Sequence, residues 1–365
     1  MYMTKVPLQF RIEELDKSTI KEQVSLYNRV FEQKWSVEEW EYINYQNPLT
    51  CTPSGGNVIG AFHGDKLIGL LTSMDMRYTY KGVIYHALQI GNISVHMDYR
   101  HQGILTSLVH YAEDIYKSKG YDFLMVFPNR NSYPAFCKMG WLETKETRWL
   151  ILNLNTNNII ERVFGFCLPK PLNIISGLLS IKSKVTGMGS SEFIIERTQS
   201  PPFGLFKDAN QNQEYMSMVL EPESATWIFK DPAYLHYVVK DGGGKQIAYY
   251  CVHEHPFVSV IGSKAEIIAS YYLINDIRVL RKSYCFFIRE LRKTFDILLE
   301  WNSLNSKREK QIRKAAGYFD VHLRKPHLVK ILSDDAEKIA TLSDKTIWNP
   351  KEIDMNTTVH YVDDE

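Results

Sequence analysis

The sequence predicts an α/β (α+β) protein built from two tandem copies of one unit, each a mixed, mainly antiparallel central sheet flanked by helices. Two observations carry this prediction. Strand-like and helix-like segments alternate along the first part of the chain, and short motifs recur in the same order in the second part. The length of 365 residues suits two domains, and 43 basic against 42 acidic side chains leave a net charge of +1. That balance argues against a nucleic-acid partner.

The first copy reveals its elements through hydrophobic periodicity and through the residues that end them. We expect helices over 16–34, from Ser36 onward, over 103–119 and over 132–139. We expect strands over 57–62, 66–76, 83–95, 123–127 and 141–154. Ser36 and Glu39 form a capping-box pattern, and Gly120 and Gly140 follow the last two helices, where glycine favours a helix end.

The second copy repeats the order of the first. The sequence YDFLMVFPNRNS at 121–132 aligns with FDILLEWNSLNS at 295–306, with the same interval from the aspartate to the Asn-Ser pair. Each copy then passes through a segment with basic residues into a glycine followed by an aromatic residue. We therefore expect a first domain over 1–154, a connecting segment over 155–191 and a degenerate second domain over 192–365.

Several classes of protein are disfavoured by composition. Five cysteines, an odd number without a C-x-x-C pair, predict neither a disulfide framework nor a zinc site. His253 and His255 have no cysteine or carboxylate partner at ligand spacing, so we expect no metal. The apolar stretch over 159–181 is broken by charged residues and prolines, and the first residues lack an apolar signal segment. We expect a cytoplasmic protein without an integral membrane segment; nothing in the sequence specifies its oligomeric state.

The segment over 93–106 carries the chemistry. It runs from a strand through a polar loop into the start of a helix. The first N–H groups of a helix have no partner within the helix, and the helix dipole favours negative charge there, so this loop suits a pyrophosphate. Gly103 lets the backbone approach the anion, Arg100 adds positive charge and Thr106 adds a hydroxyl. A plain turn containing a glycine is the ordinary alternative.

Two motifs give the sequence a resemblance to a known family. VHMDYRHQGIL at 95–105 resembles the pattern Val-x-Pro-Glu-Tyr-Arg-x-x-Gly-x-Gly/Ala of the GNAT superfamily of acyl-coenzyme A N-acyltransferases, and FCKMGW at 136–141 resembles its Tyr-Glu-Lys-Leu-Gly-Phe step. The resemblance covers about residues 10–152 and extends faintly into the second half. It implies two tandem domains of this fold, N-acyltransferase activity, and acetyl-CoA or another acyl-CoA as co-substrate.

The resemblance also implies where the coenzyme lies. Backbone groups of Ile93 and Val95 would contact the pantetheine arm, where the strand splays from its neighbour at a bulge. The residues that it assigns to the pyrophosphate are Arg100, Gln102, Gly103, Ile104, Leu105 and Thr106, and Asn129 or Asn131 would face the far end of the coenzyme. A small-molecule amine would attack the thioester directly, with Asn92 and Ser94 on the acceptor side of the strand.

The sequence departs from the family pattern at two positions. Leu105 replaces a small residue of the phosphate loop, and Phe136 replaces the tyrosine that protonates the leaving thiolate in the family. Tyr133 lies three residues earlier, about one helical turn away, and is the candidate catalytic proton donor. No general base is evident. The histidines near this region are His86, His96 and His101.

The second copy lacks an Arg-x-x-Gly loop in the corresponding segment, 271–281, so we expect it to hold no coenzyme and to shape the acceptor site. Proteins similar to this one act on amino sugars of surface polysaccharides, which makes an amino sugar the favoured acceptor. Two alternatives stay open. One is an aminoacyl transferase that builds cell-wall peptide from charged transfer RNA, which the near-neutral charge and the phosphate loop disfavour. The other is a non-catalytic coenzyme-binding sensor, which Phe136 favours.

Overall fold

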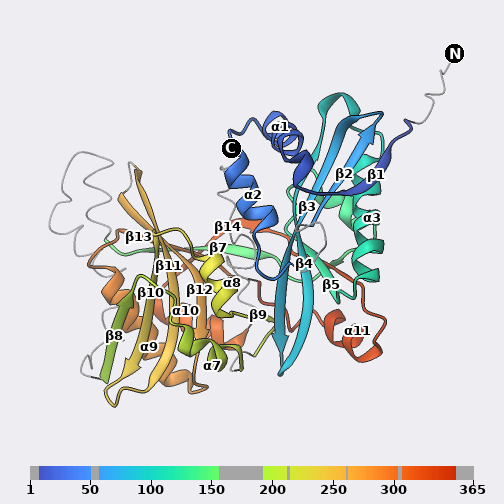
Figure 1. Cartoon of the computed structure of the whole chain (residues 1–365). Helices are drawn as coiled ribbons and strands as arrows, with labels where there is room; N and C mark the ends of the chain where they lie inside the picture. The colour runs from blue at the N-terminus through green and yellow to red at the C-terminus, as the bar shows by residue number, and fades with distance from the viewer. Residues whose placement is uncertain are drawn as a thin grey trace. The chain divides into compact units, whose positions relative to one another are not determined.

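The computed structural model of the chain describes residues 8–50, 57–155, 192–211, 214–259, 262–302 and 306–350. These residues form two sheets in two compact units (Figure 1). The first unit contains Met1–Tyr78, Ile84–Glu143 and His327–Asp344, and the second contains Thr79–Val83, Thr144–Pro326 and Lys345–Glu365. Two mainly antiparallel sheets with flanking helices confirm the predicted fold class.

The first sheet has the strand order β1-β2-β3-β4-β5-β15-β6. Its strands are β1 (Arg11–Leu15), β2 (Asn57–His63), β3 (Lys66–Tyr80), β4 (Val83–Val95), β5 (Phe123–Val126), β15 (Leu328–Ile331) and β6 (Leu142–Glu143). Strand β2 pairs antiparallel with β1 and β3, whereas β4 and β5 are parallel. A parallel pair needs a crossover, and helix α3 (Ile104–Ser118) supplies it.

Helices cover both faces of the first sheet (Figure 1). On one face the buried rings of Tyr27 and Trp40 belong to a cluster that joins α1 and α2 to β2 and β3. On the other face Leu108 and Phe136 join α3 and α4 to the sheet. The helical elements of this unit, besides α3, are η1 (Lys17–Thr19), α1 (Ile20–Phe31), α2 (Val37–Tyr45), η2 (Met97–Tyr99), α4 (Tyr133–Lys138) and α11 (Ala336–Ser343).

Local sequence signals explain where these helices begin and end. The capping box predicted at Ser36 and Glu39 is present at the start of α2. Gly120 and Gly140 have φ angles of 81° and 76° immediately after α3 and α4, in the left-handed region that ends a helix. Both helix ends are therefore confirmed as predicted.

The second sheet has the order β14-β7-β13-β12-β11-β10-β8. Its strands are β14 (Phe319–Lys325), β7 (Thr147–Asn153), β13 (Ile297–Asn302), β12 (Gly262–Tyr272), β11 (Gln246–Ser259), β10 (Tyr234–Asp241) and β8 (Phe193–Thr198). The helical elements of this unit are η4 (Phe203–Leu205), α7 (Phe206–Gln211), α8 (Pro222–Ile228), α9 (Ile277–Leu291) and α10 (Lys307–Ala316). The short strand β9 (Ser217–Met218) pairs with β3 and so belongs to the first sheet. The parallel pair β12 and β13 is joined by α9, as β4 and β5 are joined by α3.

Asp122 and Asp296, which the repeat aligns, make the same contacts in the two sheets. Asp122 accepts a hydrogen bond from the His86 N–H at 2.9 Å, and its own N–H donates to the His86 carbonyl at 2.8 Å. Asp296 makes the corresponding pair with Ser263, at 3.0 Å in each direction. Each aspartate thus ties the beginnings of two parallel strands together, so the repeat in sequence is also a repeat in structure.

Each sheet contains at least one strand from the other half of the sequence. The strand predicted over 141–154 is two strands, β6 in the first sheet and β7, which pairs with β13 and β14 in the second sheet. Strand β15, late in the chain, lies between β5 and β6 in the first sheet. The two units therefore do not follow the ranges 1–154 and 192–365, because periodicity marks a segment as a strand without saying which sheet it joins. Apart from Asn155, the connecting segment lies outside the described residues.

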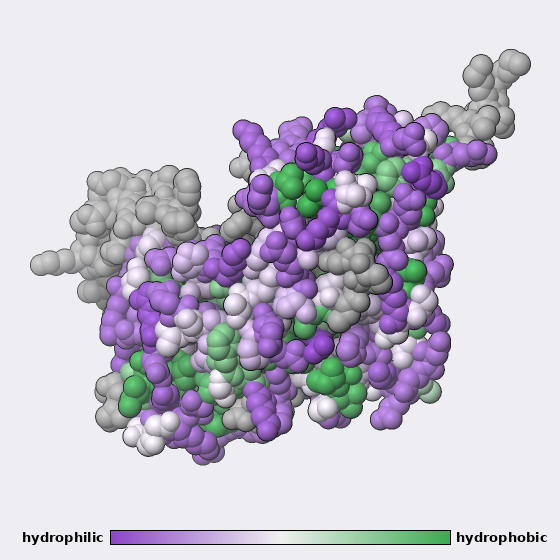
Figure 2. All heavy atoms as spheres, viewed as in Figure 1, coloured by the Kyte–Doolittle hydropathy of each residue, from purple (hydrophilic) through white to green (hydrophobic). Residues whose placement is uncertain are grey.

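Hydrophilic side chains dominate the described surface on the face that Figure 2 shows, with small apolar patches between them. The most exposed large apolar side chains are Met97, Ile194, Val83 and Ile84, which come from separate elements of the chain apart from the last two. Scattered apolar exposure of this kind is ordinary in proteins. In the described ranges, no helix combines the length and apolar character needed to cross a membrane.

Candidate functional site

Strand β4 contains a β-bulge at Gly91 and Asn92. Ile90 packs against the core beside α3, and so does Ile93. Side chains alternate between the two faces of a regular strand, so two residues three apart can share a face only if one extra residue is inserted between them. Gly91 is exposed, although the four residues before it in the strand are buried. A glycine inside a strand is a sequence signal for a bulge, and it could have located this one.

The bulge lies where β4 separates from β5. Their parallel pairing runs from Ala87–Phe123 to Gln89–Met125 and stops, while β4 continues to Val95. In the part of the chain that the structure describes, the last residues of β4 therefore have no β5 partner on that edge. Such an edge offers backbone N–H and carbonyl groups to an extended ligand.

Helix α3 begins just beyond this strand and has no side-chain cap. Gly103 is its N-cap residue, with a φ of 81°, and the first helical hydrogen bond runs from the Ser107 N–H to the Gly103 carbonyl at 3.0 Å. The N–H groups of Ile104, Leu105 and Thr106 thus point out of the helix end, where the dipole favours an anion. A Cβ built on Gly103 would meet no atom within 4 Å, so the space beside it is open.

Close packing fixes the position of this helix end. Ile104 is buried, and a Cβ built on Gly69 of β3 would lie only 2.7 Å from its Cγ2 atom and 3.2 Å from the Leu108 Cδ1 atom. The absence of a side chain at Gly69 therefore lets the first turn of α3 lie directly against β3. A larger residue there would push the helix end, and its N–H groups, away from the sheet.

Arg100 and Gln102 lie in the loop between β4 and α3. Arg100 is exposed, and its Nε atom donates to the Val95 carbonyl at 3.3 Å, which holds its positive charge at the end of β4. Gln102 donates to the Asp98 carbonyl at 3.4 Å. The loop therefore combines a held guanidinium with the uncapped helix start.

Asn129 organises the loop that follows β5. Its Oδ1 atom accepts hydrogen bonds from the N–H groups of Asn131 and Ser132, both at 3.0 Å, and from the Ser132 hydroxyl at 3.1 Å. Its side-chain oxygen thus holds the shape of the loop. Both asparagines expected near the coenzyme are exposed, and the Oδ1 atom of Asn129 is engaged within the loop.

The face of β4 opposite Ile93 carries polar groups. Ser94 is completely buried there, and its hydroxyl has no hydrogen-bond partner among the described residues. Asn92, in the bulge, is half-buried. Burial, together with the charge of Lys66, lowers the pKa of His96 below its usual value, which keeps this ring neutral at pH 7.

The two aromatic residues considered for proton donation occupy different environments. Phe136 is buried, with its ring centroid 4.8 Å from that of Trp141, so this position belongs to the core. The Tyr133 hydroxyl donates to Glu143 at 2.7 Å. This hydrogen bond to a carboxylate raises the pKa of Tyr133. Tyr133 could therefore protonate a leaving group only after its bond to Glu143 is broken.

The second copy keeps the splayed strands but closes the helix end. In the pairing of β11 with β12, Ile268 has no partner residue, which marks a β-bulge. The pairing of β12 with β13 ends at Ile267–Glu300. At the start of α9, however, the Asp276 carboxylate accepts hydrogen bonds from the N–H groups of residues 278 and 279 at 2.8 and 3.3 Å. This carboxylate takes the place that an external anion would occupy.

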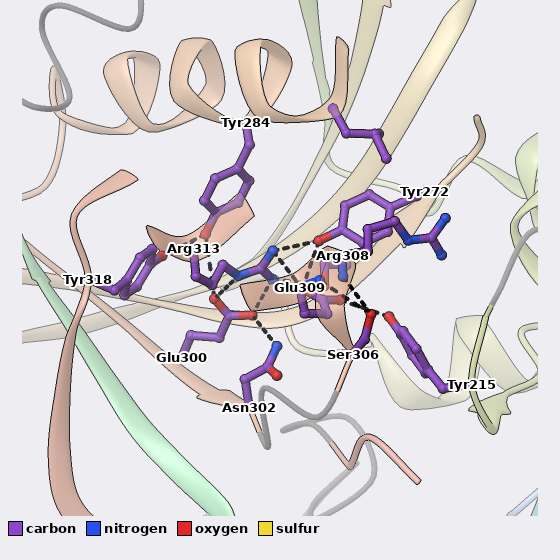
Figure 3. Close-up of polar contacts among 12 residues, drawn as sticks. Tyr215, Tyr272, Tyr284, Glu300, Asn302, Ser306, Arg308, Glu309, Arg313 and Tyr318 are labelled. Atoms are coloured by element: carbon purple, nitrogen blue, oxygen red, sulfur yellow. Dashed lines mark hydrogen bonds and ion pairs between the residues drawn. The ribbon is translucent and has the colours of Figure 1, made fainter. Parts of the chain in front are cut away.

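A buried polar network joins the splayed strands of the second copy (Figure 3). The Arg313 guanidinium of α10 contacts Glu300 of β13 at 2.8 Å and Glu309 at 2.8 Å. It also reaches Ser270 at 3.2 Å and Tyr272 at 2.5 Å, both on β12 beyond the end of its pairing with β13. All five side chains are buried. The charged side chains of Arg313, Glu300 and Glu309 thus lie beside the end of β12, the strand that is equivalent to β4. This gives a physical reason to expect no coenzyme in the second copy.

Comparison with known proteins agrees with this geometry. Residues 11–143 match the family described as the acetyltransferase (GNAT) domain. No curated protein matches the chain. Among solved structures, the chain is similar to a protein of unknown function from Enterococcus faecalis, described as a probable N-acyltransferase, with a TM-score of 0.62 and 14% identity over 89% of this chain and 73% of that one.

Two further solved structures share the fold. A GCN5-related N-acetyltransferase from Anabaena variabilis has a TM-score of 0.63 and 13% identity, over 89% of this chain and 73% of that one. The N-myristoyltransferase of Saccharomyces cerevisiae, solved with bound myristoyl-CoA, has a TM-score of 0.53 and 13% identity, over 89% of this chain and 80% of that one. Residues 11–143 thus match the acetyltransferase (GNAT) domain family, and these solved structures, at 13–14% identity, share the fold of the chain, which has two sheets.

Proposed function

We propose that the chain transfers an acetyl group from acetyl-CoA to the amine of a small molecule, with an amino sugar as the acceptor. One observation carries the coenzyme part of the proposal: the uncapped start of α3 lies directly after the unpaired edge of β4. The helix end suits a pyrophosphate and the strand edge suits an extended arm that contains amides, which is the chemical order of groups in coenzyme A.

Different residues contact different parts of the coenzyme. The N–H groups of Ile104, Leu105 and Thr106 donate hydrogen bonds to the pyrophosphate, and Arg100 adds a positive charge beside it. The backbone groups of Ile93 and Val95 pair with the pantetheine arm. This arrangement brings the thioester toward the bulge at Gly91, where the backbone is exposed.

The reaction is a direct transfer. The neutral amine nitrogen attacks the carbonyl carbon of the thioester, a C–N bond forms, and the C–S bond breaks. The coenzyme leaves as a thiolate that takes one proton, and the nitrogen loses one proton to water. The protein contributes by holding both reactants in place and by offering backbone N–H groups to the carbonyl oxygen as it gains charge.

An acceptor screen tests this function. The full-length protein is mixed with acetyl-CoA and either amino sugars, polyamines or amino acid amides, and free coenzyme thiol is followed by absorbance. We expect thiol release that depends on an amino sugar, with an N-acetylated sugar detected by mass spectrometry. Transfer only to other amines would reject the amino-sugar acceptor. Binding of acetyl-CoA without transfer to any amine would favour a coenzyme-binding sensor.

A further inference from the structure

Thr72 of β3 contacts the bulge of β4. It is 3% exposed, and its Oγ1 atom accepts a hydrogen bond from the Asn92 N–H at 3.1 Å. We propose that Thr72 is a positioning residue for the acyl-coenzyme A edge of β4, a role that rests on the function proposed above. Because its side chain is buried and reaches the site only through the backbone of Asn92, it acts without touching the coenzyme.

The bulge needs such a partner. The extra residue in a bulge disturbs the regular ladder, and a buried N–H group without an acceptor is costly. The hydroxyl of Thr72 supplies an acceptor from a side chain at this point. Gly91 makes the contact possible, since a Cβ built there would lie 3.2 Å from Thr72 Oγ1 and 3.7 Å from the Thr72 carbonyl oxygen. Thr72 therefore fits against both residues of the bulge.

The hydrogen bond affects the groups that follow it along the strand. The bulge sets which face Ile93 and Val95 occupy and separates this part of β4 from β5. Just after the end of β4, the His96 N–H donates a hydrogen bond to the Ile68 carbonyl of β3 at 2.9 Å, which is a second fixed point. If Thr72 released Asn92, the edge between these two fixed points could shift, and its backbone groups would no longer match an extended ligand.

Two substitutions at Thr72 distinguish the effect of its hydroxyl group from the effect of its branched shape. Thr72→Val keeps the branched shape and removes the acceptor, whereas Thr72→Ser keeps the acceptor. Ser73→Ala is the matched control, because it removes a buried hydroxyl at the next position of the same strand. Binding of acetyl-CoA to the full chain is measured by calorimetry, and exchange of the Asn92 amide is measured by NMR without coenzyme.

We expect Thr72→Val to weaken acetyl-CoA binding by about tenfold and to speed exchange of the Asn92 amide, since one hydrogen bond is lost. Thr72→Ser and Ser73→Ala should stay within about twofold of the natural protein. Binding by Thr72→Val within the same range, or unchanged exchange at Asn92, would overturn the proposal.

Two further results have defined meanings. If Thr72→Val does not fold, Gly91→Ala decides the matter, because its methyl group would press on the Thr72 hydroxyl; normal binding by that folded variant would reject the proposal. If the natural protein itself fails to bind acetyl-CoA, the proposed function is wrong. The exchange of the Asn92 amide then still reports separately whether Thr72 holds the bulge.

Discussion

Gly103 and Asp276 begin equivalent helices, and only Asp276 supplies a cap. The Gly103 N-cap leaves the first turn of α3 without a side-chain acceptor, whereas the Asp276 carboxylate accepts two N–H groups at the start of α9. Both helices follow a strand that is parallel to its next neighbour and splays from it. A helix end can accept an external anion only where no internal one occupies it. The difference therefore predicts one coenzyme site per chain.

Removing the cap at Asp276 should affect stability alone. Asp276→Ala deprives two N–H groups of their acceptor, which costs about 1 kcal/mol at a helix N-terminus. We expect urea denaturation to show this loss in the free energy of unfolding, while calorimetry shows unchanged affinity for acetyl-CoA. A changed affinity would assign a coenzyme role to the second copy and contradict the account.

Arg313 should be a strong determinant of stability. Arg313→Met removes the cation from a network that contains Glu300 and Glu309 and leaves two buried carboxylates without it. Breaking a buried ion pair in this way costs about 3–5 kcal/mol. Urea denaturation checks this value, with Lys314→Met as control, because Lys314 is the exposed neighbour on the same helix. Equal stability of the two variants would show that the network is unimportant.

Tyr133→Phe should have a small effect on turnover. The hydroxyl of Tyr133 is held by Glu143, and its raised pKa makes it a weak acid. A general acid contributes about 10²–10⁴-fold to a rate, so we expect a loss in kcat well below 10²-fold. Steady-state kinetics with saturating acetyl-CoA measures it. A loss of about 10²-fold or more, with KM unchanged, would establish Tyr133 as the proton donor.

His236 should make the protein less stable in mild acid. Burial lowers the pKa of His236 from 6.5 to about 4, while its Nδ1 atom lies 2.9 Å from the Tyr249 hydroxyl. Below pH 6.5 the unfolded chain takes up a proton that the folded chain refuses until about pH 4, so stability falls as the pH falls through this window, by up to about 3 kcal/mol.

A substitution tests this assignment to His236. In His236→Gln, a side chain that does not titrate replaces the buried ring. The difference in unfolding free energy between pH 7 and pH 4.5, measured in urea, should be smaller in the variant than in the natural protein. If the two proteins lose the same amount, the loss comes from other groups.

Local signals made much of the first copy predictable. The strand expected over 83–95 and the helix ended by Gly120 agree with β4 and α3 within a residue at each end. Alternating apolar residues and a glycine with positive φ act over a few residues, so one sequence suffices to place them. The predicted phosphate loop is also one contiguous segment, and it leads into the start of α3, where Gly103 is the N-cap residue.

Features that depend on distant segments were not predictable in this way. The pairing of β7 with β13 joins residues about 150 positions apart in the chain, and no local sequence pattern predicts it. Arg313 lies on a helix rich in charges, where an arginine is ordinarily exposed, and it is buried because Glu300 reaches it from a strand. The Thr72 contact likewise requires knowledge of which residue of β3 lies opposite the bulge.

Calorimetric titration with acetyl-CoA tests the central claim most directly. The natural chain is compared with Gly103→Glu and with Gly120→Glu, because both glycines have a φ of 81° and open space beside them at opposite ends of α3. The account predicts one bound molecule per chain, loss of binding in Gly103→Glu, and retained binding in Gly120→Glu, where the same backbone strain lies away from the phosphate loop. Full binding by Gly103→Glu, or two molecules bound per chain, would contradict it.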